Sequence, residues 1–306
     1  VPGREGPRPV TRSARHDTER VTTITNHFGY DEYFALRDKL GCETILVVNL
    51  MDGLAKRRPL EEAAMLAAGL VAYANAPQGA ELPEGMPDWP AIRAQNGHRE
   101  PFGAEYVQLG NEIWLGRIRD EVRDRTGLES PEELAEWYRQ VYVAYIEAIR
   151  AVDPDIRIIL DGWLGVGENS AVVHGDPTVK GNVAFLALHR YAPGPAHRLK
   201  QDGVEVDPAG LSEEDWWRVW SAMPGRFDAQ GQNRAFGDAV DALAERGYAV
   251  AATEWNWNGW NWRNLTENYQ APAAAGLGAA GFVQGLMRQG DHIALATQSM
   301  LVGSGW

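Results

Sequence analysis

Six short apolar runs, each followed by a longer stretch with polar residues, constrain the fold of this chain more than any other feature. Each run has about the usual length of a strand, and most are apolar without strict alternation, which indicates strands buried on both faces of a parallel sheet. The runs cover residues 44–49, 105–109, 156–160, 183–188, 248–253 and 292–297. Because strands and helices alternate along the chain, the sequence predicts a parallel α/β fold.

The segments between the runs have the features of helices. The clearest covers residues 130–152, where Ser130 can cap the first turn, Pro131 takes the first helical position and apolar residues recur at helical spacing. Further helices are expected at residues 31–40, 59–75, 212–220, 233–246 and 271–287. Residues 1–26 are polar and contain several Pro and Arg, so we expect a loop there.

A polar or ionisable side chain stands at the carboxyl end of every run. In a (β/α)8 barrel the active site lies at this face and draws residues from several strands. A doubly wound sheet is the alternative, but its usual glycine-rich first turn, G-x-G-x-x-G, does not occur here. We therefore predict a single (β/α)8 barrel domain over residues 1–306, with only six strands visible. The strand-end residues are Asn49, Asn111 with Glu112, Asp161, His189, Glu254 and Gln298.

Composition narrows the classes of function. The formal net charge of −13 argues against a nucleic-acid partner, and no uncharged apolar run approaches the length needed to cross a membrane. The single cysteine, Cys42, excludes an internal disulfide framework and is expected to pack as a small apolar residue. A metal-dependent hydrolase would place its ion at His189 and Asp161, but no H-x-H or H-E-x-x-H motif supports it. We expect neither a metal nor a cofactor.

Two glutamates are the strongest candidates for chemistry. Glu112 in VQLGNEIW and Glu254 in VAATEWNW each directly follow a buried strand. A carboxylate in that position costs several kcal/mol unless it is hydrogen-bonded or solvated, so its presence needs a reason. One reason is a pair of carboxylates that cleaves a glycosidic bond. The purely structural alternative is that each glutamate caps a helix or pairs with an arginine.

The residues next to the two glutamates have side chains suited to binding a sugar. Asn111 can donate a hydrogen bond to a sugar hydroxyl, and Tyr191 lies two residues after His189, on the same side of one strand, where its phenol can orient a carboxylate. Tryptophans that follow the two glutamates and are interleaved with asparagines are expected to stack on sugar rings. A second group of tryptophans, on a predicted helix, is expected to pack in the core. The first group is Trp114, Trp255, Trp257, Trp260 and Trp262, and the second is Trp216, Trp217 and Trp220.

These motifs resemble those of a known group of enzymes. G-N-E after one strand and T-E-W-N after another resemble the retaining glycoside hydrolases that are built on (β/α)8 barrels. Longer segments are similar, in order, to the α-L-arabinofuranosidase family (glycoside hydrolase family 51): residues 27–49, 61–77, 93–114, 186–194 and 253–260. The resemblance implies Glu112 as acid/base, Glu254 as nucleophile, and sugar contacts from Asn111, Tyr191 and Gln298.

The resemblance also implies that the six runs are strands three to eight of the barrel. The R-x-P-G-G-like segment of the family's first strands and its accompanying β-sandwich are not found in this sequence. We therefore expect a barrel truncated at its amino-terminal side, and whether these residues alone turn over substrate stays open. His189, Trp114, Trp257 and Asn49 are expected as further substrate contacts.

The sequence thus predicts a retaining glycosidase that acts on arabinose-containing oligosaccharides or polysaccharides. Glu112 is expected to carry the catalytic proton, with a raised pKa. Two alternatives stay open: a xylosidase or endoglucanase of the same clan, and a non-catalytic sugar-binding barrel whose two glutamates are far apart or paired with arginine. A carbohydrate is the expected partner, a homo-oligomer is compatible with the sequence, and the compartment, cytoplasmic or secreted, stays open.

Overall fold

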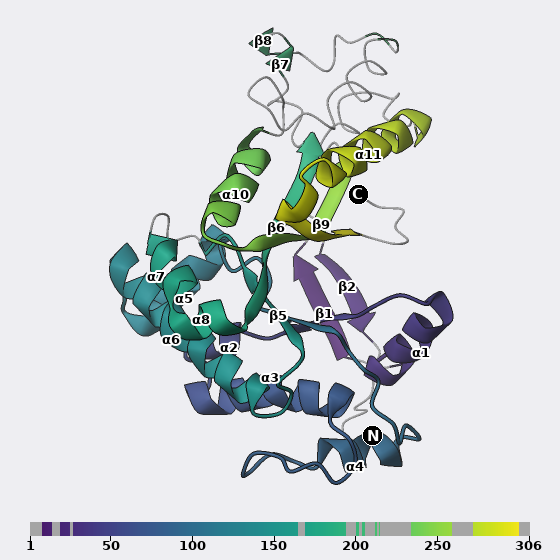
Figure 1. Ribbon diagram of the computed structural model, residues 1–306, viewed down its shortest axis with the longest axis vertical. Coiled ribbons are helices and arrows are strands. Elements are labelled where there is room, and N and C mark those ends of the chain that lie inside the picture. Colours follow the sequence, from purple (N-terminus) through teal and green to yellow (C-terminus); the bar gives the residue numbers. More distant parts are fainter. Residues whose placement is uncertain are drawn as a thin grey trace.

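A six-stranded parallel sheet forms the centre of the computed structural model (Figure 1). The structure describes residues 8–13, 19–24, 27–164, 169–193, 200–201, 204–205, 212, 214, 234–258 and 272–299. The strand order is β10-β9-β6-β5-β4-β3. The strands are β3 (Ile45–Val48), β4 (Tyr106–Leu109), β5 (Arg157–Asp161), β6 (Val183–Pro193), β9 (Ala249–Asn258) and β10 (Ile293–Gln298). All six predicted strands are confirmed, and they form an incomplete (β/α)8 barrel.

Helices connect and cover these strands, as predicted. The cap of α6 is the one expected: the Ser130 hydroxyl accepts the N–H of Glu133 at 3.1 Å, and the Glu133 carboxylate accepts the N–H of Ser130 in return. Most of the helix expected at 212–220 lies outside the described residues. The helices are α1 (Tyr30–Leu40), α2 (Met51–Leu54), α3 (Leu60–Asn75), α4 (Trp89–Gln95), α5 (Gly116–Thr126), α6 (Pro131–Arg150), α7 (Ser170–Gly175), α8 (Pro177–Asn182), α10 (Arg234–Glu245) and α11 (Pro272–Met287), with a 3-10 turn, η5 (Gly290–His292).

The amino-terminal segment is not the simple loop that the sequence predicted. β1 (Arg8–Ser13) and β2 (Glu19–Ile24) pair antiparallel in a separate two-stranded sheet. The prediction gave too much weight to Pro and Arg and too little to the Val and Thr residues, whose branched side chains favour strands. A second short pair joins β7 (Lys200–Gln201) to β8 (Val204–Glu205).

Side chains of the parallel strands alternate between two apolar layers, because successive residues of a strand point to opposite faces. The outer layer packs between the sheet and the helices and includes Val107, Leu160 and Val250. The inner layer is small: Tyr106, Ile159, Ala187 and Ala251 are buried together on the barrel side. On β3, at one edge of the sheet, Val47 is 48 % exposed. The inner face therefore opens towards solvent at this edge.

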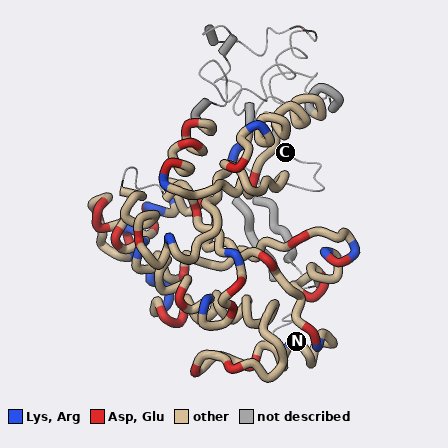
Figure 2. Tube along the Cα trace, viewed as in Figure 1, with Lys and Arg blue, Asp and Glu red and all other residues tan. Residues whose placement is uncertain are grey.

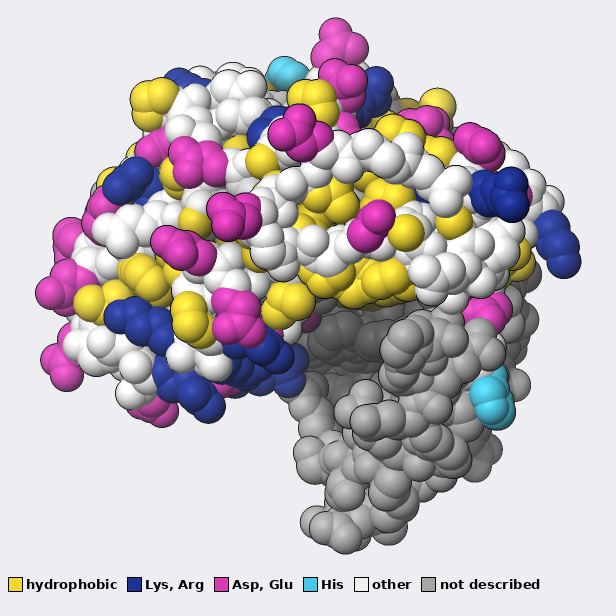
Figure 3. All heavy atoms as spheres, turned by 90° about the horizontal axis from the view of Figure 1, so that it is seen from below, with side chains coloured by type: hydrophobic (Ala, Val, Ile, Leu, Met, Phe, Trp, Pro, Cys, Tyr) yellow, Lys and Arg dark blue, Asp and Glu magenta, His cyan; other side chains and the backbone are white. Residues whose placement is uncertain are grey.

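Acidic residues outnumber basic ones, 42 to 29, and Figure 2 shows both kinds interspersed along the helices. On the face seen in Figure 3, hydrophobic side chains gather across the middle with charged ones around them. Within the described residues no helix is long and apolar enough to cross a membrane. Cys42 is exposed between α1 and β3, so the prediction that it packs as an apolar residue was wrong.

Candidate active site

Glu112 enters the site from a tight turn at the end of β4. Gly110 has a φ of +79° and Glu112 a φ of +50°, which is unusual for a residue with a side chain. A methyl group at Gly110 would lie 3.0 Å from Leu50 Cβ and from Ile113 Cγ2, so both the backbone angle and the space require glycine. The turn therefore fixes the direction in which the Glu112 side chain leaves the backbone.

Glu254 lies on β9, next to an irregularity in the sheet. Ala187 of β6 is paired with Ala251 of β9, and His189 is paired with Glu254. Two steps along β6 thus correspond to three along β9, which is the pattern of a β-bulge. The extra residue allows Thr253 and Glu254, which are neighbours in sequence, both to contact His189.

His189 stands between the two glutamates. It is 7 % exposed, and its Nδ1 lies 3.1 Å from Oε1 of Glu112 and 3.6 Å from Oε2 of Glu254. Its other ring nitrogen, Nε2, lies 3.2 Å from Oγ1 of Thr253. The imidazole is therefore held on both sides and joins the two carboxylates.

Tyr191 orients Glu254 from the same strand. Its hydroxyl donates to Oε2 of Glu254 at 2.7 Å, and Oγ of Ser299 lies 2.6 Å from the same phenol oxygen. Burial, together with the hydrogen bond to Glu254, raises the pKa of Tyr191 well above its ordinary value, although Ser299 opposes the shift. The phenol thus stays protonated and keeps donating to the carboxylate.

The two carboxylates lie close to each other. One oxygen of Glu112, one of Glu254 and a ring nitrogen of His189 all lie within 4.8 Å of one another. The side chains of Glu112 and Glu254 are 28 % and 30 % exposed, so a ligand can reach both. The sequence predicted that these strands would bring the two glutamates to one face, and the structure does so.

The charge state of Glu112 differs from the expectation. The hydrogen bond from His189 lowers the pKa of Glu112 and outweighs burial, which acts in the opposite direction. The predicted raised pKa was therefore wrong. The sequence could not show that His189, 77 residues away, would contact this carboxylate.

Asp161 stabilises the turn that carries Glu112 through hydrogen bonds to backbone amides. It is 4 % exposed, and its carboxylate oxygens accept the N–H groups of Ile113 at 3.2 Å and of Trp163 at 3.0 Å. The rings of Trp114 and Trp163, next to these two amides, meet edge to face at 5.5 Å. Burial raises the pKa of Asp161 to about 7, against the lowering effect of the two amides. Among the described residues, the group that could hold a metal ion consists of Glu112, His189 and Glu254 and does not include Asp161, which one alternative had placed there with His189.

The remaining predicted substrate contacts, Asn111, Gln298 and Asn49, form hydrogen bonds with other residues. Asn111 is exposed beside Glu112, and its Oδ1 lies 3.4 Å from the buried Nε2 of Gln108. Gln298 is exposed on β10, with its Nε2 3.5 Å from Oδ1 of Asn256. Asn49 accepts the N–H of Asp52 at 3.3 Å, at the start of α2.

The tryptophans do not all behave as predicted. Trp255 is 5 % exposed and its ring lies 5.4 Å from that of Phe282 on α11, so it belongs to the outer core. The reason is strand alternation, because the residue after an inward Glu254 points outward. The side chain of Trp257 lies outside the described residues, and so do Trp260, Trp262, Trp216, Trp217 and Trp220.

Two family models match large parts of the chain. The model of the alpha-L-arabinofuranosidase 1 domain matches residues 6–192. The chain belongs to the alpha-L-arabinofuranosidase 1 domain family. The model of cellulase (glycosyl hydrolase family 5) matches residues 111–283, so both matches identify a glycoside hydrolase domain and confirm the resemblance seen in the sequence.

Relatives of this domain include proteins named as arabinofuranosidases. The intracellular exo-alpha-(1->5)-L-arabinofuranosidase of Streptomyces lividans is 32 % identical over 160 residues, which are 50 % of this chain and 20 % of the relative. Alpha-L-arabinofuranosidase C of Emericella nidulans is 30 % identical over 160 residues, covering 52 % of this chain and 26 % of the relative. The matched part of the chain thus spans about a fifth to a quarter of these relatives.

Solved structures share the fold. The family 51 alpha-L-arabinofuranosidase AbfB of Bifidobacterium longum superposes with a TM-score of 0.57 at 20 % identity, over 91 % of this chain and 52 % of that one. The arabinose complex of the Thermotoga maritima alpha-L-arabinofuranosidase gives a TM-score of 0.53 at 20 % identity, over 92 % and 48 % of the two chains. At this identity the likeness shows the fold alone.

Some residues of this glycoside hydrolase domain were missed by the sequence reasoning. Thr253 and Ser299 each directly adjoin a predicted residue, and Trp163 follows the third predicted strand. Considering every residue within three positions of the end of a predicted strand would have found all three. The role of Asp161 as an acceptor for backbone amides had no sequence signal, because it depends on the path of the neighbouring turn.

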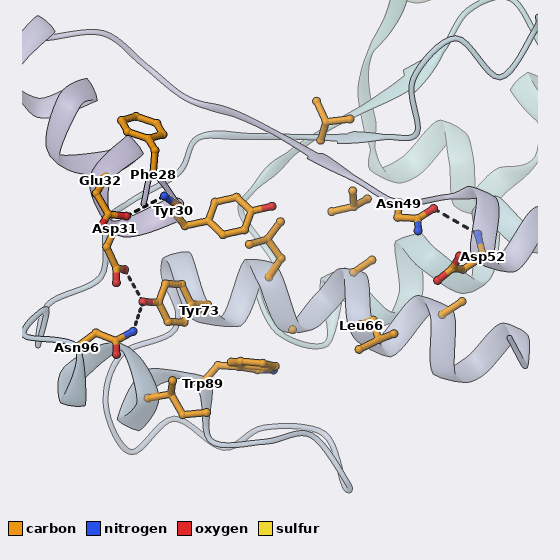
Figure 4. A pocket seen from close by; sticks show the side chains of 18 residues that line it. Phe28, Tyr30, Asp31, Glu32, Asn49, Asp52, Leu66, Tyr73, Trp89 and Asn96 are labelled. Atoms are coloured by element: carbon orange, nitrogen blue, oxygen red, sulfur yellow. Dashed lines mark hydrogen bonds between the residues drawn. The ribbon is translucent and has the colours of Figure 1, made fainter. Parts of the chain in front are cut away.

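A cavity of about 640 Å³ lies away from the glutamate pair, between α1, β3, α3 and α4 (Figure 4). Its lining is mainly apolar and includes Leu66 and Trp89. At one end the Tyr73 hydroxyl donates to Asp31 and accepts from Nδ2 of Asn96 at 2.9 Å. Asn49 lines this cavity, on the side of β3 where the inner face is open.

Proposed function

We propose that this protein is a retaining glycosidase that releases α-L-arabinofuranosyl groups. The separation of the two carboxylates carries the proposal. Retaining enzymes hold their carboxyl groups about 5–5.5 Å apart, whereas inverting enzymes need about 6.5–9.5 Å to admit a water molecule. Oxygens of Glu112 and Glu254 lie within 4.8 Å, which suits the retaining geometry.

Glu254 is proposed as the nucleophile. The hydrogen bond from Tyr191 holds one carboxylate oxygen and stabilises its negative charge, so the other is free to attack the anomeric carbon. The position of Glu254 within the β6–β9 ladder keeps the attacking group on a rigid element. Attack would form a covalent glycosyl–enzyme ester as the leaving oxygen departs.

Glu112 is proposed as the acid/base. Because its pKa is lowered by His189, we assign the catalytic proton to the Glu112–His189 pair, whose atoms lie 3.1 Å apart. The proton passes through Glu112 to the leaving oxygen in the first step. In the second step Glu112 takes a proton from water, which attacks the ester and releases the sugar with its original configuration.

The substrate class rests on the relatives and on the site. Both sequence relatives named above are arabinofuranosidases by name. Trp114, two residues after Glu112 in sequence, meets Trp163 edge to face, and both rings are partly exposed, so a sugar ring can stack on them. Asn111 offers an exposed amide for the hydroxyls of the sugar. These features suit a small neutral saccharide.

A second candidate is hydrolysis of a β-glucoside or xyloside by the same pair. The match of the cellulase model to residues 111–283 supports it. The mechanism would be unchanged, and only the shape of the pocket around the pair would differ.

The test compares aryl α-L-arabinofuranoside with aryl β-glucoside and aryl β-xyloside as substrates of the full chain. We expect the arabinofuranoside to be cleaved, with retention observed by NMR of the first-formed product. Glu254→Gln should lower kcat at least about 1000-fold, equivalent to about 4 kcal/mol.

Glu105→Gln provides the matched control, since Glu105 is exposed at the opposite end of β4 and should tolerate the change. Preference for the glucoside or xyloside would favour the second candidate. Normal turnover by Glu254→Gln would reject the nucleophile assignment.

A further inference from the structure

Three metal-ligating atoms converge between β4, β6 and β9. Nδ1 of His189 lies 3.1 Å from Oε1 of Glu112 and 3.6 Å from Oε2 of Glu254, and the three residues each offer one atom within 4.8 Å of the others. Imidazole nitrogen with two carboxylate oxygens is a donor set that Zn²⁺ accepts. The cluster combines one buried imidazole with two partly exposed carboxylates.

The spacing of these atoms agrees with a tetrahedral ion. Bonds of about 2.0–2.2 Å from Zn²⁺ to nitrogen and oxygen place neighbouring ligand atoms about 3.3–3.6 Å apart. The two distances from His189 already lie near that range. The remaining distance, between the glutamates, can shorten by small side-chain rotations because both carboxylates are partly exposed.

The second nitrogen of His189 has a partner in the form of the ring that would bind a cation. Nε2 lies 3.2 Å from the hydroxyl oxygen of Thr253, which can accept the Nε2–H. In that tautomer the lone pair of Nδ1 is available to a cation, and binding of the cation would replace the hydrogen bond that Nδ1 otherwise donates to Glu112. Metal-bound histidines in proteins commonly donate their other N–H in this way.

We propose that Glu112, His189 and Glu254 form a binding site for a divalent transition-metal cation of the Zn²⁺ type, and that the bound ion inhibits the enzyme. The ion would coordinate both glutamates and so remove them from proton transfer and from nucleophilic attack. A fourth position faces the partly exposed side of the pair and is open to water. The inhibition rests on the proposed function, whereas binding of the ion does not.

The experiment titrates the chelator-treated full chain with Zn²⁺ in a calorimeter near pH 7.5. We expect a Zn²⁺ site whose affinity falls at least 100-fold in Glu112→Gln and in Glu254→Gln. Thr253→Val, which removes only the acceptor for Nε2–H, should lower the affinity by about 10–100-fold. Because Gln is nearly the same size as Glu, both variants should fold, and thermal unfolding of each variant checks this.

His292→Gln is the matched control. His292 also faces a carboxylate, with its Nδ1 3.6 Å from Oδ1 of Asp241, but this pair is exposed and has a single acidic partner. The control should bind Zn²⁺ as the wild type does. The proposal is wrong if Zn²⁺ does not bind, if both Gln variants keep the wild-type affinity, or if His292→Gln abolishes binding.

Activity assays separate this proposal from the proposed function. If the protein cleaves arabinofuranosides, Zn²⁺ should inhibit it at concentrations that match the calorimetric affinity, and a chelator should restore activity. Zn²⁺ that binds at this cluster without inhibiting an active enzyme overturns the inhibitory part. A protein without glycosidase activity that still loses Zn²⁺ binding in both Gln variants retains the site and contradicts only the proposed function.

Discussion

The phenol of Tyr191 makes a short hydrogen bond to Glu254, and its removal tests how much that hydrogen bond contributes to catalysis. Tyr191→Phe deletes the hydrogen bond to Glu254, which is 2.7 Å long, without removing the ring. A hydrogen bond to a charged group contributes about 1.5–3 kcal/mol, so we expect kcat to fall by about 10- to 100-fold with a small change in KM.

Tyr106→Phe is the control for this change. Tyr106 lies on the same inner face, and its hydroxyl accepts from Arg157 at 3.0 Å rather than contacting either glutamate. Steady-state kinetics of the two variants on the same substrate gives the comparison. Equal effects of both substitutions on kcat would contradict a specific role for Tyr191.

Asp161 makes stability depend on pH in a direction opposite to that of an ordinary salt-bridged carboxylate. Its pKa is raised to about 7 in the folded protein, so the folded state binds this proton more tightly than the unfolded state does. Its contribution to the free energy of unfolding is therefore most favourable below about pH 4. That contribution decreases as the pH rises to about 7, by a few kcal/mol.

Asp161→Asn removes this titration while keeping the size of the side chain. Between pH 4 and 7 the free energy of unfolding of the wild type should fall relative to that of the variant, as measured by urea denaturation at each pH. All other ionisable groups are present in both proteins, so their contributions largely cancel in the difference. Parallel curves for the two proteins would show that Asp161 does not titrate in this range.

At the scale of an element, the turn after β4 depends on its first glycine. Gly110→Ala would suffer both from the left-handed φ of +79° and from contacts of 3.0 Å with Leu50 and Ile113. We expect a loss of about 2–4 kcal/mol in the free energy of unfolding. Gly103→Ala separates the two effects, since Gly103 has a φ of +71° but nothing within 4 Å of the added methyl.

Chemical denaturation of the two glycine variants should give the larger loss for Gly110→Ala, with about 1–2 kcal/mol for Gly103→Ala. Equal losses would mean that Leu50 and Ile113 move aside easily. In that case backbone conformation alone would explain the glycine at the turn.

The elements of this fold were predictable from sequence to different degrees. Apolar runs of strand length placed all six parallel strands, and Ser130 with Pro131 placed the start of α6, because these signals are local. β6 and β9 extend to Pro193 and Asn258, beyond their apolar runs, since their polar ends stay paired with each other. The hairpin of β1 and β2 was missed because its composition is typical of a loop. Its strands are defined by their pairing with each other, which no local sequence signal showed.

The sequence was enough to choose the residues of the candidate site, but it did not predict how they are arranged. Glu112, Glu254, His189 and Tyr191 could be chosen because each is a polar residue at the end of an apolar strand. The bulge in β9, the left-handed Glu112 and the contact from His189 depend on register and on distant chain segments. The direction of the Glu112 pKa was wrong for that reason.

At the scale of the whole molecule, the open edge at β3 is the feature that we expect to favour self-association. Among the described residues β3 pairs with β4 alone, and Val47 presents an apolar side chain at that edge. An unpaired edge with apolar side chains favours association with another chain. We expect Val47→Lys to lower the fraction of associated protein at high concentration, as measured by size-exclusion chromatography with light scattering.

Leu277→Lys is the control for this change, because Leu277 is a comparably exposed apolar residue on α11. It should leave the association state nearly unchanged. If both substitutions act equally, general solubility rather than the β3 edge governs association.

The short distance between the two carboxylates also reports on the shape of the sheet. Glu112 follows β4 and Glu254 lies on β9, with β5 and β6 between them. In a flat sheet three strand spacings would separate these backbones by about 14 Å. Side chains that stand roughly perpendicular to the sheet could not close that gap, so curvature brings the two oxygens within 4.8 Å. Any change that flattens the sheet would move the glutamates towards the separation that suits inversion. The anomeric configuration of the product would then indicate how strongly the sheet is curved.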